Sequence, residues 1–242
     1  MKTTRIGPLR VRRVTRPTGE NYEKIEPLTC VLMHGFGAPG DDLVALAGAI
    51  DVPPGTELVF PEAPHALAEL ARDPRYGDAR AWWMIDVAGL ERALATGTLR
   101  DLSTESPPGL PAARAAMSEV LDELAREAPG RRLVLGGFSQ GAMLALDLAL
   151  REPGRPLAGL VLLSGALIAA REWVPRMTGR AGTPVFQSHG RSDVVLSFAG
   201  AEQLRDALTK AGLDVRFQSF QGPHTIPPAV LEELGPWLHA RR

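Results

Sequence analysis

The sequence predicts an α/β fold: a mostly parallel central sheet flanked by helices. Three observations support this prediction. Short apolar runs recur along the chain, most of them are continuous rather than alternating, and longer segments with helical periodicity lie between them. A continuous apolar run suits a strand that is covered on both faces, as in a parallel sheet. Strands that alternate with helices along a chain favour a parallel α/β arrangement.

The apolar runs expected to form strands are residues 30–36, 57–61, 132–138, 159–165, 184–190 and 215–222. The segments expected to form helices are residues 41–50, 111–127, 140–151, 199–211 and 228–239. Residues 9–14 alternate weakly between apolar and polar side chains, and we expect them to form an exposed edge strand.

One long stretch departs from this alternation. Residues 62–109 contain no clean strand–helix pair, are rich in Pro, Gly and Asp, and include the adjacent Trp82 and Trp83. Long irregular segments in a compact domain are commonly functional. We therefore expect one domain over residues 1–242, in which 62–109 is an irregular insertion on the substrate side. Trp82 and Trp83 are expected to bind substrate as rigid apolar walls; the alternative is that they anchor the insertion to the core.

The composition excludes some classes of partner. The 242 residues carry 27 Lys and Arg against 28 Asp and Glu, a formal net charge of −1, so nucleic acid is not expected as a partner. No apolar stretch is long enough for a membrane span, and the N-terminus lacks the apolar core of a signal peptide. The single cysteine, Cys30, cannot form an internal disulfide. We therefore expect a cytoplasmic protein.

A serine between glycines is the candidate nucleophile. The stretch Gly137-Phe138-Ser139-Gln140-Gly141 is a G-x-S-x-G pattern that follows an apolar run and precedes a helical segment. A sharp turn from strand to helix needs small residues beside the serine and places its hydroxyl at the C-terminal edge of the sheet. The same pattern also fits an ordinary turn in which the serine caps the helix, so its interpretation depends on partner residues elsewhere in the chain.

A serine nucleophile needs a base, and the base needs a carboxylate that orients it. His224 lies in a Pro/Gly-rich loop after the last expected strand, whereas His239 lies on the final helix and is typical of a surface residue. Asp193 follows the C-terminal end of the strand 184–190. We therefore predict a catalytic triad of Ser139, Asp193 and His224.

The early glycine-rich loop LMHGFGAPGDDL, residues 32–43, is the candidate oxyanion site. The backbone N–H of Phe36, together with that of Gln140, the residue after the nucleophile, would stabilise a carbonyl oxygen as it becomes anionic. His34 is expected to shape this loop without transferring a proton. No cysteine cluster and no pair of histidines at helical spacing supports a metal site, so no metal is expected.

Five motifs resemble the carboxylesterase/acyl-protein thioesterase branch of the α/β-hydrolase family, which includes lysophospholipase-like members. In chain order they are LMHGFGAPGDD, PEAPH, GGFSQGA, HGRSD and GPHTI. The resemblance implies an α/β-hydrolase fold, the same triad and oxyanion donors, no cofactor and often a homodimer. The chain departs from the family pattern at Ala142, where a second glycine is usual, at Leu196-Ser197, where Val-Pro is common, and in the segment around Trp82.

We therefore expect a serine hydrolase that cleaves the carboxylic ester of a small-molecule or acylated substrate through an acyl-enzyme. An acyl-thioesterase or a lysophospholipase is the alternative enzyme, because the same machinery serves all three reactions. A third interpretation, of a different class, is a catalytically silent α/β-hydrolase fold that acts as a binding module. The complete set of candidate triad and oxyanion residues argues against this third interpretation.

Overall fold

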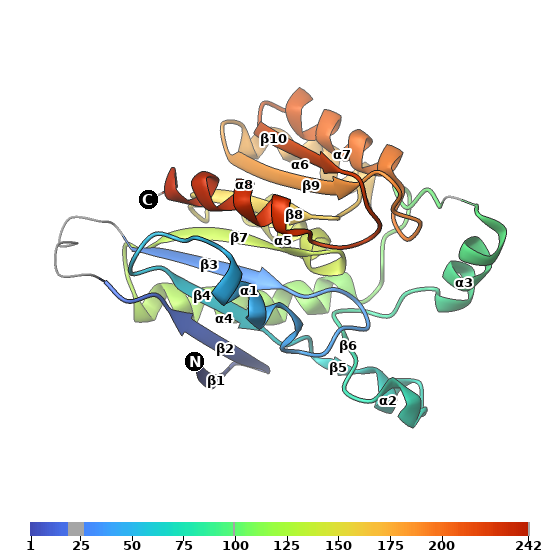
Figure 1. Cartoon of the computed structure of the whole chain (residues 1–242), viewed down its shortest axis with the longest axis horizontal. Helices are drawn as coiled ribbons and strands as arrows, with labels where there is room; N and C mark the ends of the chain where they lie inside the picture. Colours follow the sequence, from blue (N-terminus) through green and yellow to red (C-terminus); the bar gives the residue numbers. More distant parts are fainter. Residues whose placement is uncertain (19–26, 99, 242) are drawn as a thin grey trace.

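The computed structural model describes residues 1–18, 27–98 and 100–241. An eight-stranded sheet runs through its centre in the order β1-β2-β4-β3-β7-β8-β9-β10 (Figure 1). Its strands are β1 (Lys2–Ile6), β2 (Leu9–Thr15), β3 (Leu28–Met33), β4 (Glu57–Pro61), β7 (Arg132–Phe138), β8 (Gly159–Leu163), β9 (Pro184–Gly190) and β10 (Asp214–Phe220). From β4 to β10 every pair of neighbours is parallel, whereas β2 is antiparallel to both β1 and β4. The predicted mostly parallel sheet is confirmed.

The edge strand was predicted in the wrong place. All six apolar runs contribute strands, but residues 9–14 belong to β2, which has neighbours on both sides. The edge is β1, a strand in which only Ile6 is buried. An edge strand exposed to solvent needs no apolar run, so its polar sequence carries little strand signal.

Helices cover both faces of the sheet. The elements outside the 62–109 region are η1 (Asp42–Ala45), α1 (Leu46–Ala49), α4 (Leu110–Glu127), α5 (Gln140–Arg151), α6 (Ala170–Met177), η3 (Thr178–Arg180), α7 (Phe198–Lys210) and α8 (Pro228–His239). On β3, Val31 and Met33 join the apolar cluster that includes α4 to α7, while Cys30 and Leu32 join the cluster that includes α1 and α8. Burial on both faces explains why the strand reads as a continuous apolar run.

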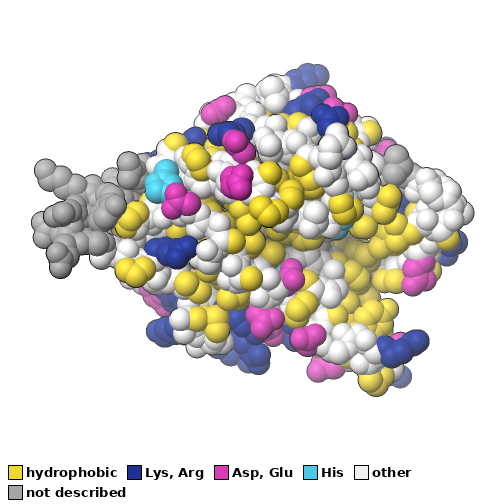
Figure 2. All heavy atoms as spheres, in the orientation of Figure 1, with side chains coloured by type: hydrophobic (Ala, Val, Ile, Leu, Met, Phe, Trp, Pro, Cys, Tyr) yellow, Lys and Arg dark blue, Asp and Glu magenta, His cyan; other side chains and the backbone are white. Residues whose placement is uncertain are grey.

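The 62–109 region contains several short elements. They are β5 (His65–Ala66), α2 (Leu67–Leu70), η2 (Pro74–Tyr76), β6 (Arg80–Ala81) and α3 (Val87–Thr96). Strands β5 and β6 pair only with each other, and α3 has no buried residue. The region lies beyond the C-terminal ends of β3 and β7 (Figure 1). Figure 2 shows many apolar side chains in a hollow on this side of the molecule.

None of the helices in the described ranges combines the length and the apolar character needed to cross a lipid bilayer.

Candidate active site

Ser139 stands at the junction of β7 and α5. Its backbone is in the left-handed region, at φ 55° and ψ −117°, which is strained for a residue other than glycine. The side chain makes no capping hydrogen bond to the helix that follows it. The simpler interpretation, a turn in which the serine caps the helix, therefore does not describe this residue. The strained turn instead places Ser139 at the C-terminal end of β7, where it lines the cavity described below.

The two glycines of the motif allow this turn to form. A Cβ atom on Gly137 would lie 2.4 Å from the carbonyl oxygen of Met33, and one on Gly141 would lie 2.0 Å from the same oxygen. Both positions therefore need glycine because β3 passes too close for any side chain. Ala142, a departure from the family pattern, is accommodated because residue 165 is glycine: a Cβ there would lie 3.0 Å from the Ala142 methyl group.

The structure brings Asp193 and His224 together. Atom Nδ1 of His224 lies 2.6 Å from Oδ2 of Asp193. The other carboxylate oxygen of Asp193 accepts hydrogen bonds from the backbone N–H groups of Val195 and Leu196, both 2.9 Å long. The carboxylate is thus held from one side while its second oxygen faces the imidazole. In this arrangement the proton of a neutral His224 sits on Nδ1, which leaves Nε2 free to act as a base.

Asp193 stays ionised because of the groups that surround it. Burial alone raises the pKa of this carboxyl, but hydrogen bonds from His189, His224 and the Leu196 N–H outweigh burial and bring the pKa well below its usual range. In a catalytic triad, an ionised carboxylate orients the neighbouring imidazole and stabilises its charged form.

His189 is a residue of the site that the sequence reasoning missed. It is fully buried at the end of β9, and its Nε2 atom lies 3.2 Å from Oδ2 of Asp193 and 2.8 Å from the carbonyl oxygen of Leu196. Its Nδ1 atom has no hydrogen-bond partner in the described part of the chain. The signal available in the sequence was the HGRSD motif, in which His189 is the second-last residue of a strand and lies four positions before the acid.

The glycine-rich loop after β3 is fixed by buried polar contacts. His34 accepts a hydrogen bond at Nε2 from the Ala63 N–H, 3.1 Å away, and its Nδ1 lies 2.9 Å from the Gly35 carbonyl oxygen. Burial lowers the pKa of His34, so the ring stays neutral near neutral pH. These contacts agree with the expectation that His34 shapes the loop. Phe36 follows in the same loop and lines the cavity described next.

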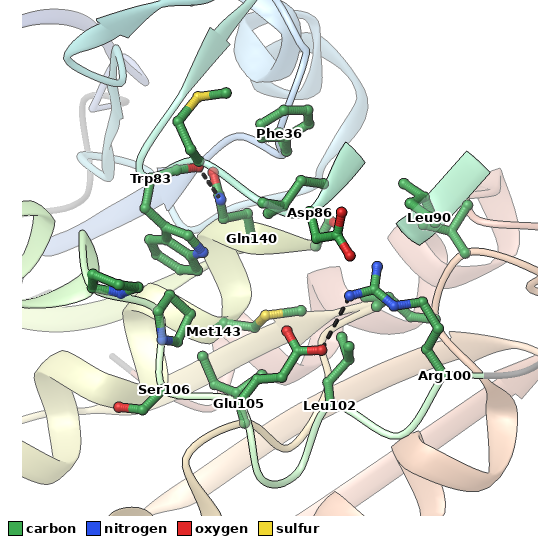
Figure 3. Close-up of a pocket in the computed structure, with 18 of the residues that line it drawn as sticks. Phe36, Trp83, Asp86, Leu90, Arg100, Leu102, Glu105, Ser106, Gln140 and Met143 are labelled. Atoms are coloured by element: carbon green, nitrogen blue, oxygen red, sulfur yellow. Dashed lines mark hydrogen bonds and ion pairs between the residues drawn. The ribbon is translucent and has the colours of Figure 1, made fainter. Parts of the chain in front are cut away.

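A cavity of about 530 Å³ lies beside Ser139. Its lining includes the three residues Ser139, Gln140 and His224. Its apolar wall includes Phe36, Trp83, Ile85, Leu90, Leu102, Met143 and Ile168. Figure 3 shows the lining residues, among which Arg100 forms an ion pair with Glu105 at 3.1 Å. A mostly apolar cavity beside the serine can hold the hydrocarbon portion of an acyl group.

The two adjacent tryptophans have different surroundings. Trp83 lines the cavity, whereas Trp82 does not. Trp82 is completely buried, and its indole N–H donates a 2.9 Å hydrogen bond to the carbonyl oxygen of His34. The expectation that both tryptophans contact substrate is therefore corrected for Trp82. Trp82 packs into the core beside the loop of His34, while its neighbour Trp83 reaches the cavity.

No group of three or more His, Cys, Asp or Glu side chains in the described ranges is arranged to hold a metal ion.

The chain is similar to proteins of one known family. A family model described as Phospholipase/Carboxylesterase matches residues 20–240. The chain is similar to acyl-protein thioesterase 1 of Cryptococcus neoformans, at 28% identity over 92% of this chain and 98% of the relative. Among solved structures it resembles esterase PE8 (TM-score 0.75, 28% identity, 95% and 97% coverage) and acyl-protein thioesterase 2 of Zea mays (TM-score 0.69, 26% identity, 96% and 98% coverage).

Proposed function

The chain belongs to the phospholipase/carboxylesterase family of hydrolases, and from this premise we propose that it hydrolyses carboxylic esters through an acyl-enzyme formed on Ser139. His224 removes the hydroxyl proton as Ser139 attacks the ester carbonyl, and then protonates the departing alcohol. A water molecule, deprotonated by the same histidine, then attacks the acyl-enzyme. The bond between Ser139 and the acyl carbon breaks, the acid leaves, and His224 returns the proton to the Ser139 oxygen. Asp193 keeps the imidazole in the required orientation and tautomer.

One observation carries this proposal: the 2.6 Å contact between His224 and Asp193, formed beside a cavity that Ser139 and His224 both line. A second histidine–carboxylate pair provides a comparison within the same chain. His239 lies 3.3 Å from Asp51, but neither residue lines the cavity. A base must be within reach of the nucleophile to act on it, so the cavity distinguishes the two pairs.

The oxyanion of the tetrahedral intermediate is proposed to accept hydrogen bonds from the backbone N–H groups of Phe36 and Gln140. Gln140 is the first residue of α5, so its N–H has no acceptor within the helix. The helix dipole also favours negative charge at this end of α5. Phe36 comes from the loop after β3 and Gln140 from the start of α5, yet both line the cavity.

The substrate is proposed to be a carboxylic ester whose acyl group occupies the cavity. Acyl-thioester hydrolysis is the second candidate, because the relatives named above include two acyl-protein thioesterases. The apolar wall around Trp83 and Met143 suits the hydrocarbon chain of either substrate. The two reactions share the acyl-enzyme and differ only in the leaving group.

A fluorophosphonate probe tests the core of the proposal. The wild-type protein should be labelled at Ser139, and Ser139→Ala should not be labelled. A binding module without catalytic activity would leave the wild-type protein unlabelled. A panel of nitrophenyl esters, acyl-thioesters and lysophospholipids then ranks the three substrate classes by kcat/KM. The ester assignment is replaced if thioesters of the same acyl chain give the higher kcat/KM.

A further inference from the structure

We infer that Trp82 and Gln140 are positioning residues, which hold both proposed oxyanion donors against one backbone segment, residues 80–83. The inference rests on the proposed function, because it assigns a task to side chains that surround the Phe36 and Gln140 N–H groups. It adds two residues to the machinery whose side chains are not themselves proposed to touch the reacting atoms.

The first contact is made by the Gln140 side chain. Its Oε1 atom accepts a 2.9 Å hydrogen bond from the Trp82 backbone N–H, and its Nε2 donates a 2.9 Å hydrogen bond to the Trp83 carbonyl oxygen (Figure 3 shows the latter). The residue is only 3% exposed. One amide thus pairs with two backbone groups of the same segment, much as a neighbouring strand would. These two hydrogen bonds fix the orientation of Gln140, the first residue of α5.

The second contact is made by the Trp82 indole. Its Nε1–H donates to the carbonyl oxygen of His34, two residues before Phe36. On the other side of Phe36, the Gly37 N–H donates a 2.8 Å hydrogen bond to the Arg80 carbonyl oxygen. The Arg80 N–H in turn donates a 3.0 Å hydrogen bond to the Ala38 carbonyl oxygen. The loop is therefore hydrogen-bonded to residues 80–83 both before and after Phe36, and the same segment binds the Gln140 side chain.

The two donors are therefore held by the same backbone segment. Phe36 follows β3 and Gln140 begins α5, so the two donors reach the cavity from different elements. Both are fixed to residues 80–83, which belong to the region between Glu62 and Gly109. Oxyanion stabilisation depends on donors that are already in position, and an error of about 1 Å costs about 10²-fold in rate. This part of the region thus assembles the catalytic site, while Trp83 faces the cavity.

The chain offers a matched control for each residue. Trp173 is also fully buried, and its indole N–H donates a 2.9 Å bond to Asp147, but it does not line the cavity. Gln187 is also fully buried, and its Nε2 donates a 2.8 Å bond to the Ala201 carbonyl oxygen. Trp→Phe removes a buried indole N–H donor, and Gln→Met removes a buried side-chain amide, either beside the oxyanion loop or away from it. The acceptor of the indole is a backbone carbonyl for Trp82 and a carboxylate for Trp173. The amide of Gln140 makes two hydrogen bonds to the backbone and that of Gln187 makes one.

The experiment compares Trp82→Phe and Gln140→Met with Trp173→Phe and Gln187→Met on nitrophenyl butyrate. The first pair should lower kcat by about 10-fold to 100-fold, with KM within about threefold and no change in the apparent pKa of the pH–rate profile. An alkyl trifluoromethyl ketone, which forms a tetrahedral oxyanion adduct, should lose affinity by a similar factor. The control pair should lower the melting temperature and leave kcat within about twofold of the wild type.

The outcomes separate this inference from the proposed function. If wild-type turnover and Ser139 labelling are present but Trp82→Phe and Gln140→Met keep the wild-type kcat, the positioning inference is wrong and the function stands. If the wild type shows neither turnover nor labelling, the proposed function fails first. If Trp82→Phe does not fold, the kcat of Gln140→Met alone tests the positioning inference by the same criteria. A loss of kcat in the control variants as large as in the test variants also overturns the inference.

Discussion

Nδ1 of His224 lies 2.6 Å from Oδ2 of Asp193, although 31 positions separate the two residues in the chain. The contact forms because β9 and β10 are parallel neighbours, so the loops that follow them emerge at the same edge of the sheet. Asp193 follows β9 and His224 follows β10. The first prediction tests whether this pair, and not another histidine–acid pair, carries the reaction.

Ser139→Ala and His224→Ala should each lower kcat by more than about 10³-fold with little change in melting temperature, and the double variant should be little worse than either. Members of a catalytic triad act as one unit, so under the proposed mechanism removing the second residue costs little. His239→Ala is the matched control, because it breaks a histidine–aspartate pair at the surface and should keep full activity. Ester turnover and thermal unfolding measure both effects. Substantial activity in His224→Ala would remove this residue from the mechanism.

The pH–rate profile should show one ionisation between about pH 4 and pH 8, that of a histidine base. Asp193 contributes no second step in this window, because its pKa lies well below the ordinary range. Activity on an activated ester therefore decreases as the pH falls and histidine becomes protonated. A rate that stays flat down to about pH 4 would falsify the assignment of a histidine base.

Stability should also depend on Asp193. Its pKa in the folded protein is lowered from the ordinary 3.8, so the ionised carboxylate stabilises the native state above that pH. The stabilisation is lost as the pH falls from 3.8 through the folded-state value. The wild type should therefore melt at a higher temperature than Asp193→Asn at pH 6, and the difference should shrink below pH 3.8. A constant difference across this range would contradict the assigned cause.

His189→Leu should impair catalysis more than His189→Gln. Nε2 of His189 lies 3.2 Å from Oδ2 of Asp193, and Leu removes this donor, whereas Gln retains an N–H at a similar distance from the backbone. Losing a hydrogen bond to a charged group costs about 1.5–3 kcal/mol of stability. The less firmly held Asp193 should orient His224 less well, so kcat should also fall in His189→Leu. The loss should come with a raised pKa of Asp193, read from the pH dependence of stability. Equal activity in both variants would show that His189 contributes by packing and not by its hydrogen bond to Asp193.

Trp83→Ala should change the ranking of short against long acyl esters, because Trp83 lines the cavity. One methylene is worth roughly 1 kcal/mol of discrimination in an apolar pocket, so a removed wall shifts the ranking visibly. Trp82→Ala should instead cost about 3–5 kcal/mol of stability and leave the ranking unchanged. The measurements are kcat/KM for nitrophenyl esters of increasing chain length and the free energy of unfolding. An unchanged profile in Trp83→Ala would place the acyl group elsewhere.

The local elements were predictable where one pattern dominates. The strand over residues 132–138, the helix Gln140–Arg151 and the final helix Pro228–His239 have the predicted bounds. Each is either apolar throughout or clearly periodic. The edge strand Lys2–Ile6 escaped prediction, because its exposed residues leave no continuous apolar signal. The helix Val87–Thr96 also escaped prediction, although its sequence is amphipathic; none of its residues is buried. The cytoplasmic location and the homodimer stay predictions.

The sequence by itself determined the α/β alternation, the glycine–serine turn and the chain order of Ser139, Asp193 and His224. These features depend on local patterns and on the rule that parallel strands end at one edge. Only the tertiary structure decided which tryptophan faces the cavity, that His189 reaches Asp193, and that Gln140 binds the Trp82–Trp83 backbone. The physical reason is that a buried hydrogen bond pairs groups far apart in sequence, and its partner is set by packing rather than by any local pattern.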